Sequence, residues 1–185
     1  MALDNPLSWA QVAALALTAG WSPADAVIAS SITEPESARI VNNVQQGQPY
    51  ATTGWGLWQI TPGDSEPQFG VDDAMLNGLN NARAAHAKWQ GAGGWSPWTT
   101  WQKGFNVPYI PAATQAVAAV SNLSVSALHR LVDEAAGGHG LDAFTPDHAI
   151  ARMDAYLRQF LRAADKQLVY QHMALMRTGG NGWLP

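Results

Sequence analysis

The sequence predicts a mainly α-helical fold with at most a short β-hairpin, followed by a helical C-terminal extension. Three observations support this prediction: apolar residues recur at helical spacing, residues suited to helix caps precede those runs, and polar segments rich in glycine and proline separate them. The chain has 185 residues, of which 47% are apolar and 13% charged, enough for a buried core. We expect the main domain boundary near Pro111, with domains at 1–111 and 112–185.

The first two expected helices have clear start signals. Leu7–Ala19 carries apolar residues at helical spacing, with Ser8 placed to cap its N-terminus and Gly20 to end it. The second helix opens with Ser22 as the cap and Pro23 at the first helical position, where a missing N–H is tolerated.

A proline is expected to stop the second helix. Pro35 cannot make the helical hydrogen bond and disfavours helix at Glu34, so Glu36 should lie at or just past the helix end. The segment that follows, Arg39–Thr53, is rich in Asn and Gln, contains a Gly and a Pro, and is expected to be a loop. A short hairpin is possible only around Tyr50–Trp58.

Further helices are expected on both sides of the boundary. Asp72–Gln90 has one apolar face and ends at a glycine cluster. An aromatic segment, Trp95–Phe105, closes the first part of the chain. Beyond Pro111 we expect helices at Ala112–Val120 and Ser124–Ala136.

A long helix is expected near the C-terminus, from Pro146 to Arg177. Its apolar residues repeat at three- and four-residue steps, close to a coiled-coil seam. We expect it to dock onto copies of itself or onto another protein, such as a phage tail or virion protein. The alternative is a break near Ala163, after which the chain folds back on the two shorter helices.

Charge and residue usage narrow the function classes. The net charge of −4, without a basic run, argues against non-specific nucleic-acid binding, and the absence of cysteine excludes disulfides and zinc–thiolate sites. No signal peptide and no membrane span are expected, so we predict synthesis in the host cytoplasm. No cofactor or metal is expected, because His139 and His148, with Asp142 and Asp147, match no known ligand spacing.

Tryptophan is unusually frequent in the first part of the chain. Seven of the nine tryptophans fall between Trp21 and Trp101. Indole rings stack well on sugars, so a carbohydrate-binding groove is one interpretation, with at least two of the seven lining it. The other interpretation is core packing, which also uses tryptophan.

Two carboxylates at the end of an apolar helical run are the candidate chemistry. Glu34 and Glu36 precede, by about twenty residues, the motif G-L-W-Q-I at 56–60. A carboxylic acid beside an apolar, indole-rich wall keeps its proton toward neutral pH and can act as a general acid on a glycosidic bond. The alternative for Glu36 is a solvated carboxylate beside Arg39.

Residues 7–111 resemble the lysozyme-like domain of soluble lytic transglycosylases and goose-type lysozymes, in the form found in phage tail proteins and lysins. That family has a helix ending in Glu-Ser, a variable loop, Gly-Leu-aromatic-Gln-Ile, a helix with an Asn-Ala pair, and a tryptophan-rich closing segment. The corresponding residues here are Glu36-Ser37, Gly56-Leu57-Trp58-Gln59-Ile60, Asn81-Ala82, and Trp95-Ser96-Pro97-Trp98-Thr99-Thr100-Trp101 followed by Gly104-Phe105.

The resemblance implies that Glu36 is the catalytic acid. It also implies that Gly56 lets the backbone pass close to the acid and that Gln59 helps to fix the sugar or the acid; an ordinary turn is the alternative for the glycine. The substrate-binding residues implied are Ser37, Gly56, Trp58, Gln59, Asn81, Trp98 and Trp101.

Two departures from the family pattern bear on the site. Pro35 directly precedes the acid, which leaves Glu34 as a rival for the role. Trp101 stands where the family often has a tyrosine, so any step that relies on that hydroxyl lacks it here.

The number of carboxylates bears on the reaction. An inverting hydrolase needs a base roughly 6.5–9.5 Å from the acid. A lytic transglycosylase needs the acid alone, which then acts as base toward the sugar's 6-hydroxyl and gives a 1,6-anhydro product. With one well-marked carboxylate, the sequence favours the transglycosylase. The candidates for a second carboxylate are Asp64, Glu66, Asp72 and Asp73.

The function expected is therefore cleavage of the β-1,4 bond between N-acetylmuramic acid and N-acetylglucosamine in peptidoglycan, by an enzyme associated with a phage particle and acting at the bacterial cell wall. One alternative is a non-catalytic virion or wall-binding protein that keeps the fold. The other is a free endolysin with hydrolytic activity.

Overall fold

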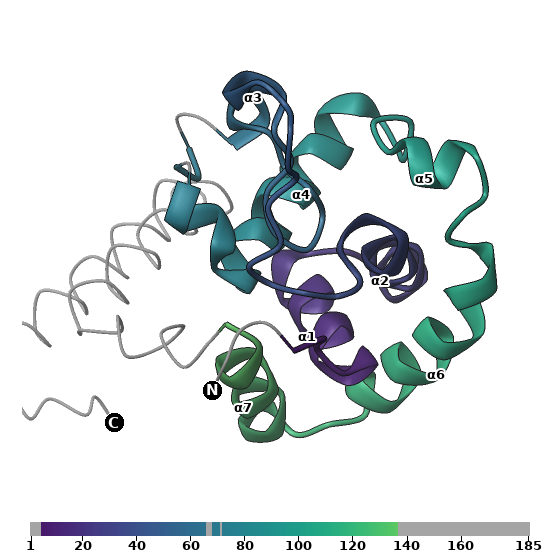
Figure 1. The fold of residues 1–185 in the computed structure, drawn as a ribbon. Helices are drawn as coiled ribbons and strands as arrows, with labels where there is room; N and C mark the ends of the chain where they lie inside the picture. The colour runs from purple at the N-terminus through teal and green to yellow at the C-terminus, as the bar shows by residue number, and fades with distance from the viewer. Residues whose placement is uncertain (1–4, 66–67, 71, 137–185) are drawn as a thin grey trace, which may run out of the picture. The chain divides into compact units, whose positions relative to one another are not determined.

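The structure, a computed structural model, describes residues 5–65, 68–70 and 72–136 (Figure 1). These residues fall within one compact unit that is mainly helical, as the sequence predicts. Within it, α1 and α2 lie in the middle, and α4, α5, α6 and α7 are arranged around them. The long helix expected from Pro146 to Arg177, and its alternative break, lie outside the described residues.

Helix α1, Trp9–Ala19, begins and ends as its sequence predicts. The Ser8 side chain accepts a hydrogen bond from the Gln11 N–H, and the Gln11 side chain accepts one from the Ser8 N–H, which forms a capping box. Gly20 ends the helix in the left-handed conformation, at φ +113°. The five consecutive residues Val12 to Ala16 are fully buried, so the middle of α1 is covered on all sides and lies at the centre of the core.

Helix α2, Pro23–Ser37, runs further than predicted. Pro35 does not stop it, because the proline lies in the last turn, where its missing N–H removes a single bond. The helix ends at Ala38, at φ +53°, where the Ala38 N–H bonds to the Glu34 carbonyl oxygen at 2.9 Å. Glu36 therefore lies within the last turn of α2, not beyond it.

The segment after α2 contains a tight turn in place of a regular hairpin. A short 3₁₀ helix, η1, covers Tyr50–Thr52. Trp55 and Ile60 then exchange backbone hydrogen bonds of 3.1 and 3.0 Å, and a second isolated bridge joins Trp55 to Val44. Among the described residues these bridges are the only β-type pairing, so the turn at 55–60 is what remains of the expected hairpin.

The third expected helix is divided into two. After the short α3, Pro62–Ser65, a 3₁₀ helix η2 covers Asp72–Leu76 and α4 covers Gly78–Ala92. Asn77 separates the last two, because its side chain accepts a hydrogen bond from the Asn80 N–H and caps α4.

The remaining helices follow in chain order. The short α5, Thr99–Gln102, lies within the aromatic segment, and the 3₁₀ helix η3, Val107–Tyr109, follows that segment. Next come α6, Ile110–Ser121, and α7, Val125–Ala135, close to the two helices expected there. Ser124 caps α7 through a hydrogen bond from Ala127 N–H.

The compact unit does not end at Pro111, where the sequence analysis placed a boundary. Pro111 lies in the first turn of α6, and α6 packs against both α1 and α2, while α7 packs against α1. Val117, Val120 and Val132 are buried in the same core as α1. Because these apolar faces cover α1 and α2, residues 112–136 complete the core of the N-terminal part.

No helix in the described part of the chain combines the length and the apolar character needed to cross a membrane.

Candidate active site

Glu36 points from the last turn of α2 toward α5. Its Oε1 atom accepts a hydrogen bond of 2.5 Å from the hydroxyl of Thr100. The side chain is partly buried, and no ion pair involves it within the described residues. Glu36 is therefore a carboxyl group held in one orientation by a neutral donor from another helix.

The surroundings of Glu36 favour its protonated form. Burial raises the pKa of the carboxyl above its ordinary value, because the charged form loses hydration. The hydrogen bond from Thr100 and the positive charge of Lys88 act in the opposite direction, and burial outweighs both. A carboxyl with a raised pKa is suited to donate a proton near neutral pH.

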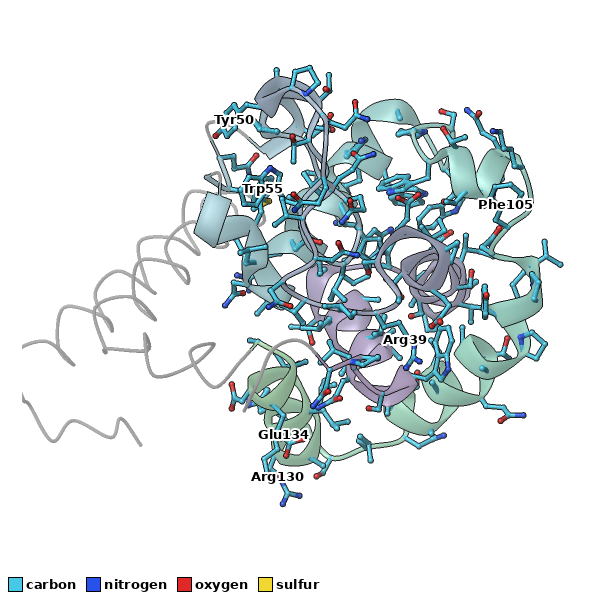
Figure 2. All side chains as sticks on the ribbon, in the orientation of Figure 1. Arg39, Tyr50, Trp55, Phe105, Arg130 and Glu134 are labelled. Atoms are coloured by element: carbon cyan, nitrogen blue, oxygen red, sulfur yellow. The ribbon has the colours of Figure 1, made fainter. Side chains whose placement is uncertain are left out.

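Glu34, the rival for the acid, is engaged elsewhere. Its carboxylate forms an ion pair with Arg39, whose guanidinium also donates to the carbonyl oxygen of Leu7. The same guanidinium lies over the ring of Trp9, 4.7 Å from its centroid. Arg39 is labelled in Figure 2. The geometry thus favours Glu36 over Glu34 as a proton donor, because Glu34 is tied to a permanent cation.

A second carboxylate, Asp64 of α3, is paired with a lysine. Lys88 Nζ lies 2.7 Å from Asp64 Oδ2, and the Thr61 hydroxyl donates to the same oxygen at 2.7 Å. Burial raises the pKa of Asp64, but the hydrogen bonds from Lys88 and Thr61 outweigh it and hold the pKa below its ordinary value. The other candidates are not described at their side chains: Glu66, Asp72 and Asp73.

Gly56 is required by its protein neighbours. It has φ +72°, and a Cβ there would lie 2.5 Å from the carbonyl oxygen of Met75 and 2.6 Å from Asn81 Nδ2. Asn81 is fully buried; its Oδ1 accepts from Trp58 N–H and its Nδ2 donates to the Trp55 carbonyl, both at 2.9 Å. The close approach that demands glycine is therefore to α4 and η2, whereas the resemblance implied an approach to the acid.

Ser37 connects the end of α2 to the same turn. Its buried hydroxyl lies within hydrogen-bonding distance of the carbonyl oxygens of Leu57, at 2.9 Å, and Thr33, at 3.0 Å. Both neighbours are backbone groups of the protein. Ser37 thus holds the turn against α2, beside Glu36, rather than presenting a hydroxyl to solvent.

Gln59 stabilises the turn from within. Its Nε2 donates to the carbonyl of Gly56 at 2.8 Å and lies 3.4 Å from that of Asn43. The residue itself has φ +50°, an uncommon conformation for a side chain other than glycine or asparagine. Gly54 makes room for it, because a Cβ at Gly54 would lie 2.7 Å from Gln59 Oε1. The sequence analysis missed this glycine.

The tryptophans proposed for a groove divide into two groups. Trp58 is fully buried, with its Nε1 donating to the Ala29 carbonyl at 2.9 Å, and Trp98 is 3% exposed, with its Nε1 donating to the Trp58 carbonyl at 3.0 Å. These two side chains are part of the core, contrary to the expectation that they line a groove. Trp101, on α5, is 40% exposed and accessible to a ligand.

A continuous aromatic cluster joins Trp58 and Trp98 to three other tryptophans in this region, Trp21, Trp89 and Trp95. Trp21 contacts Trp58 and Trp95 at 5.7 and 5.9 Å between ring centroids, and Trp95 contacts Trp98 at 5.7 Å. His86 packs edge-on against Trp21 at 5.1 Å. The interpretation of the tryptophans as core residues is therefore right for this cluster. The cluster is part of the core that holds the candidate site in place.

Two residues that sequence reasoning missed lie close to the acid: Thr100 and Lys88. Lys88 stands seven residues after Asn81 on α4, two helical turns on the same face, and that spacing could have identified it. Thr100 carries no such signal, because it is 64 residues from Glu36 in the chain. Within the described residues, no group of three or more His, Cys, Asp or Glu side chains is placed to hold a metal ion.

Comparison with known proteins gives one match. Residues 13–100 match the family whose model is described as a lysozyme-like domain. The match runs from the middle of α1 to the start of α5, and so includes Glu36, the 55–60 turn, Asn81, Lys88 and Thr100. No curated protein and no solved structure gives a significant match.

Proposed function

We propose that the lysozyme-like domain carried by this chain cleaves the glycan strand of peptidoglycan, with Glu36 as the general acid. The family supports a glycosidase or transglycosylase at a coarse level, and a peptidoglycan-related activity. The observation that carries the finer proposal is the state of Glu36: a partly buried carboxyl with a raised pKa, held by Thr100 and outside any ion pair in the described part of the chain.

The proposed reaction begins with proton transfer. The Glu36 carboxylic acid donates its proton to the glycosidic oxygen between N-acetylmuramic acid and N-acetylglucosamine. The bond from C1 to that oxygen breaks, and its electron pair leaves with the oxygen. The 6-hydroxyl of the muramic acid then attacks C1 and returns its proton to Glu36, so that a 1,6-anhydro sugar forms and the acid is regenerated.

The electrostatics of Asp64 favour this reaction over inverting hydrolysis. A hydrolytic base must accept a proton from water, and the ion pair with Lys88 lowers the pKa of Asp64, which makes it a weak base. Glu36, in contrast, has a raised pKa and is the stronger base once it has given up its proton. Of these two carboxyl groups, the one better suited to the second proton transfer is therefore the one that performs the first.

Mass analysis of glycan products from purified peptidoglycan tests the proposal. Transglycosylation gives anhydro products, each lighter by one water than the corresponding hydrolysis product. Hydrolysis products would overturn the choice of reaction but leave Glu36 as the acid. No product from the wild-type chain, with intact folding, would favour the non-catalytic wall-binding protein.

The place of action and the partners belong to the same proposal. The substrate is the glycan strand of the cell wall, and a virion is the proposed carrier, with docking through the C-terminal residues. Because 112–136 form part of the compact unit, the docking segment is now confined to residues beyond 136. Light scattering tests the proposed docking on the full chain and on a variant with Met153 and Leu157 changed to Asp. Equal masses for the two chains, together with equal binding to a virion, would contradict the docking.

A further inference from the structure

A lysine–aspartate pair lies near the start of α5, the helix that contacts the candidate acid, and no step of the proposed reaction uses it. Lys88 of α4 and Asp64 of α3 are 2.7 Å apart, and their side chains are 18% and 31% exposed. The Thr61 hydroxyl donates to the same Asp64 oxygen and fixes it further. The pair is therefore held in one geometry and is partly removed from water, where charges act more strongly than at an open surface.

The Lys88 ammonium group lies close to the start of α5, the helix whose Thr100 bonds to Glu36. Its Nζ lies 5.3 Å from the centroid of the Trp98 ring, and Trp98 directly precedes α5, which carries Thr100 and its bond to Glu36. The charge of Lys88 acts on the Glu36 carboxyl without forming an ion pair with it in the described part of the chain.

A neutral donor contacts the acid, and the neighbouring carboxylate in the sequence is already paired. Thr100 of α5 is a neutral donor to it, and the neighbouring carboxylate on α2, Glu34, is paired with Arg39. Lys88 is the one charged residue for which a direct electrostatic effect on Glu36 is resolved among the described residues.

We propose that Lys88 is a positioning residue that stabilises the Glu36 carboxylate formed during the reaction, and that Asp64 limits how strongly Lys88 acts on the resting acid. The inference rests on the proposed function of Glu36. When the glycosidic oxygen takes the proton, Glu36 becomes negative, and a cation already fixed nearby stabilises that charge without rearrangement. The opposite charge of Asp64 weakens the pull of Lys88 before the reaction, so the resting acid keeps its proton.

Two substitutions are expected to move the pKa of Glu36 in opposite directions. Asp64→Asn leaves the charge of Lys88 uncompensated, so the pKa of Glu36 falls. Lys88→Met removes the cation and leaves the Asp64 carboxylate unpaired nearby, so the pKa of Glu36 rises. Lys88→Arg keeps the charge and is expected to restore a pKa close to that of the wild type. A purely structural role for the pair would not produce opposite signs.

Carbon-13 NMR titration of the Glu36 carboxyl in the full chain reads these shifts without any turnover, with the thermal unfolding of each variant as the folding control. On glycan strands, kcat of Lys88→Met is expected to fall about tenfold at the wild-type optimum, with KM little changed and Lys88→Arg restoring most of the loss.

The outcomes separate the inference from the proposed function. If the two variants shift the pKa of Glu36 in the same direction or not at all, while Glu36→Gln abolishes turnover, the role of the pair is overturned and Glu36 remains the acid. If the two variants shift the pKa of Glu36 in opposite directions but the wild-type chain cleaves no glycan, the proposed function is overturned, and with it the catalytic use of Lys88.

Discussion

The two sides of the last turn of α2 carry the same type of residue in different chemical states. On the outer side, Glu34 is bound to Arg39, which lies over Trp9. On the inner side, Glu36 accepts one hydrogen bond from Thr100, and its pKa is raised by burial. An α-helix turns through about 100° per residue, so two residues two apart point in nearly opposite directions.

The difference shows that the surroundings decide the role of a carboxylate. The contrast depends on α2 continuing through Pro35, because only a helical backbone sends Glu34 and Glu36 to opposite sides. The outer glutamate is neutralised by a cation and supports the chain at the end of the helix. The inner one is desolvated, and no cation in the described part of the chain contacts it, which is the condition that favours a protonated acid.

The largest expected effect is a loss of turnover when the inner carboxyl, Glu36, is replaced. Glu36→Gln is expected to lower turnover of purified peptidoglycan by about two to four orders of magnitude, because the amide cannot donate the proton. Glu34→Gln is the matched control and should change turnover only mildly, since its side chain lies on the outer side. The reverse ranking would move the acid to Glu34 and contradict the comparison.

The next effect concerns the stability of the 55–60 turn, which Asn81 holds. Asn81→Ala leaves the Trp58 N–H and the Trp55 carbonyl without their buried partner, so the free energy of unfolding should fall by about 2–4 kcal/mol. Asn122→Ala is the control, because Asn122 is exposed and its loss should remain within about 0.5 kcal/mol. Denaturant unfolding of both variants checks this prediction, and equal losses would show that Asn81 does not support the turn.

A smaller effect links Glu36 to pH. Its pKa is raised in the folded chain, so the folded state holds this proton more tightly than the unfolded state. The stabilisation is complete below the ordinary value of 4.5 and is lost as the pH rises through the folded-state pKa. Glu36→Gln should therefore gain stability relative to the wild type at neutral pH, with the difference closing below pH 4.5. Unfolding curves across pH that stay parallel would contradict it.

The smallest effect is expected on the outer side. Glu34→Gln removes a partly exposed ion pair with Arg39, and such pairs contribute about 0–1 kcal/mol. We expect a slight fall in Tm that high salt reduces, with turnover retained. A loss of several kcal/mol would show that the outer side is as tightly integrated as the inner side.

Local signals in the sequence predicted much of the fold. Ser8 and Ser22 cap helices as expected, because a cap depends on residues within one turn of it. Pro35 was misjudged, since its effect depends on how many helical residues remain after it. The boundary at Pro111 failed because the covering of α1 by α6 and α7 is a tertiary contact, invisible in local pattern.

The candidate site was less predictable from the sequence. The resemblance identified Glu36, but it gave no means of telling that Trp58 and Trp98 point into the core while Trp101 stays exposed. The contacts that set the state of the acid join α2 to α4 and α5. Thr100 and Lys88 belong to those contacts, and their role appears only when the helices are packed together.

The protonation state of Glu36 in the wild-type chain tests the central claim most directly. A carbon-13 titration of its carboxyl, assigned by the signal that disappears in Glu36→Gln, reports that state without substrate. The inner carboxyl is predicted to keep its proton above the ordinary value of 4.5, since burial outweighs Thr100 and Lys88. A midpoint at or below 4.5 would contradict the account, because the inner side would then hold an ordinary carboxylate and no acid poised to act.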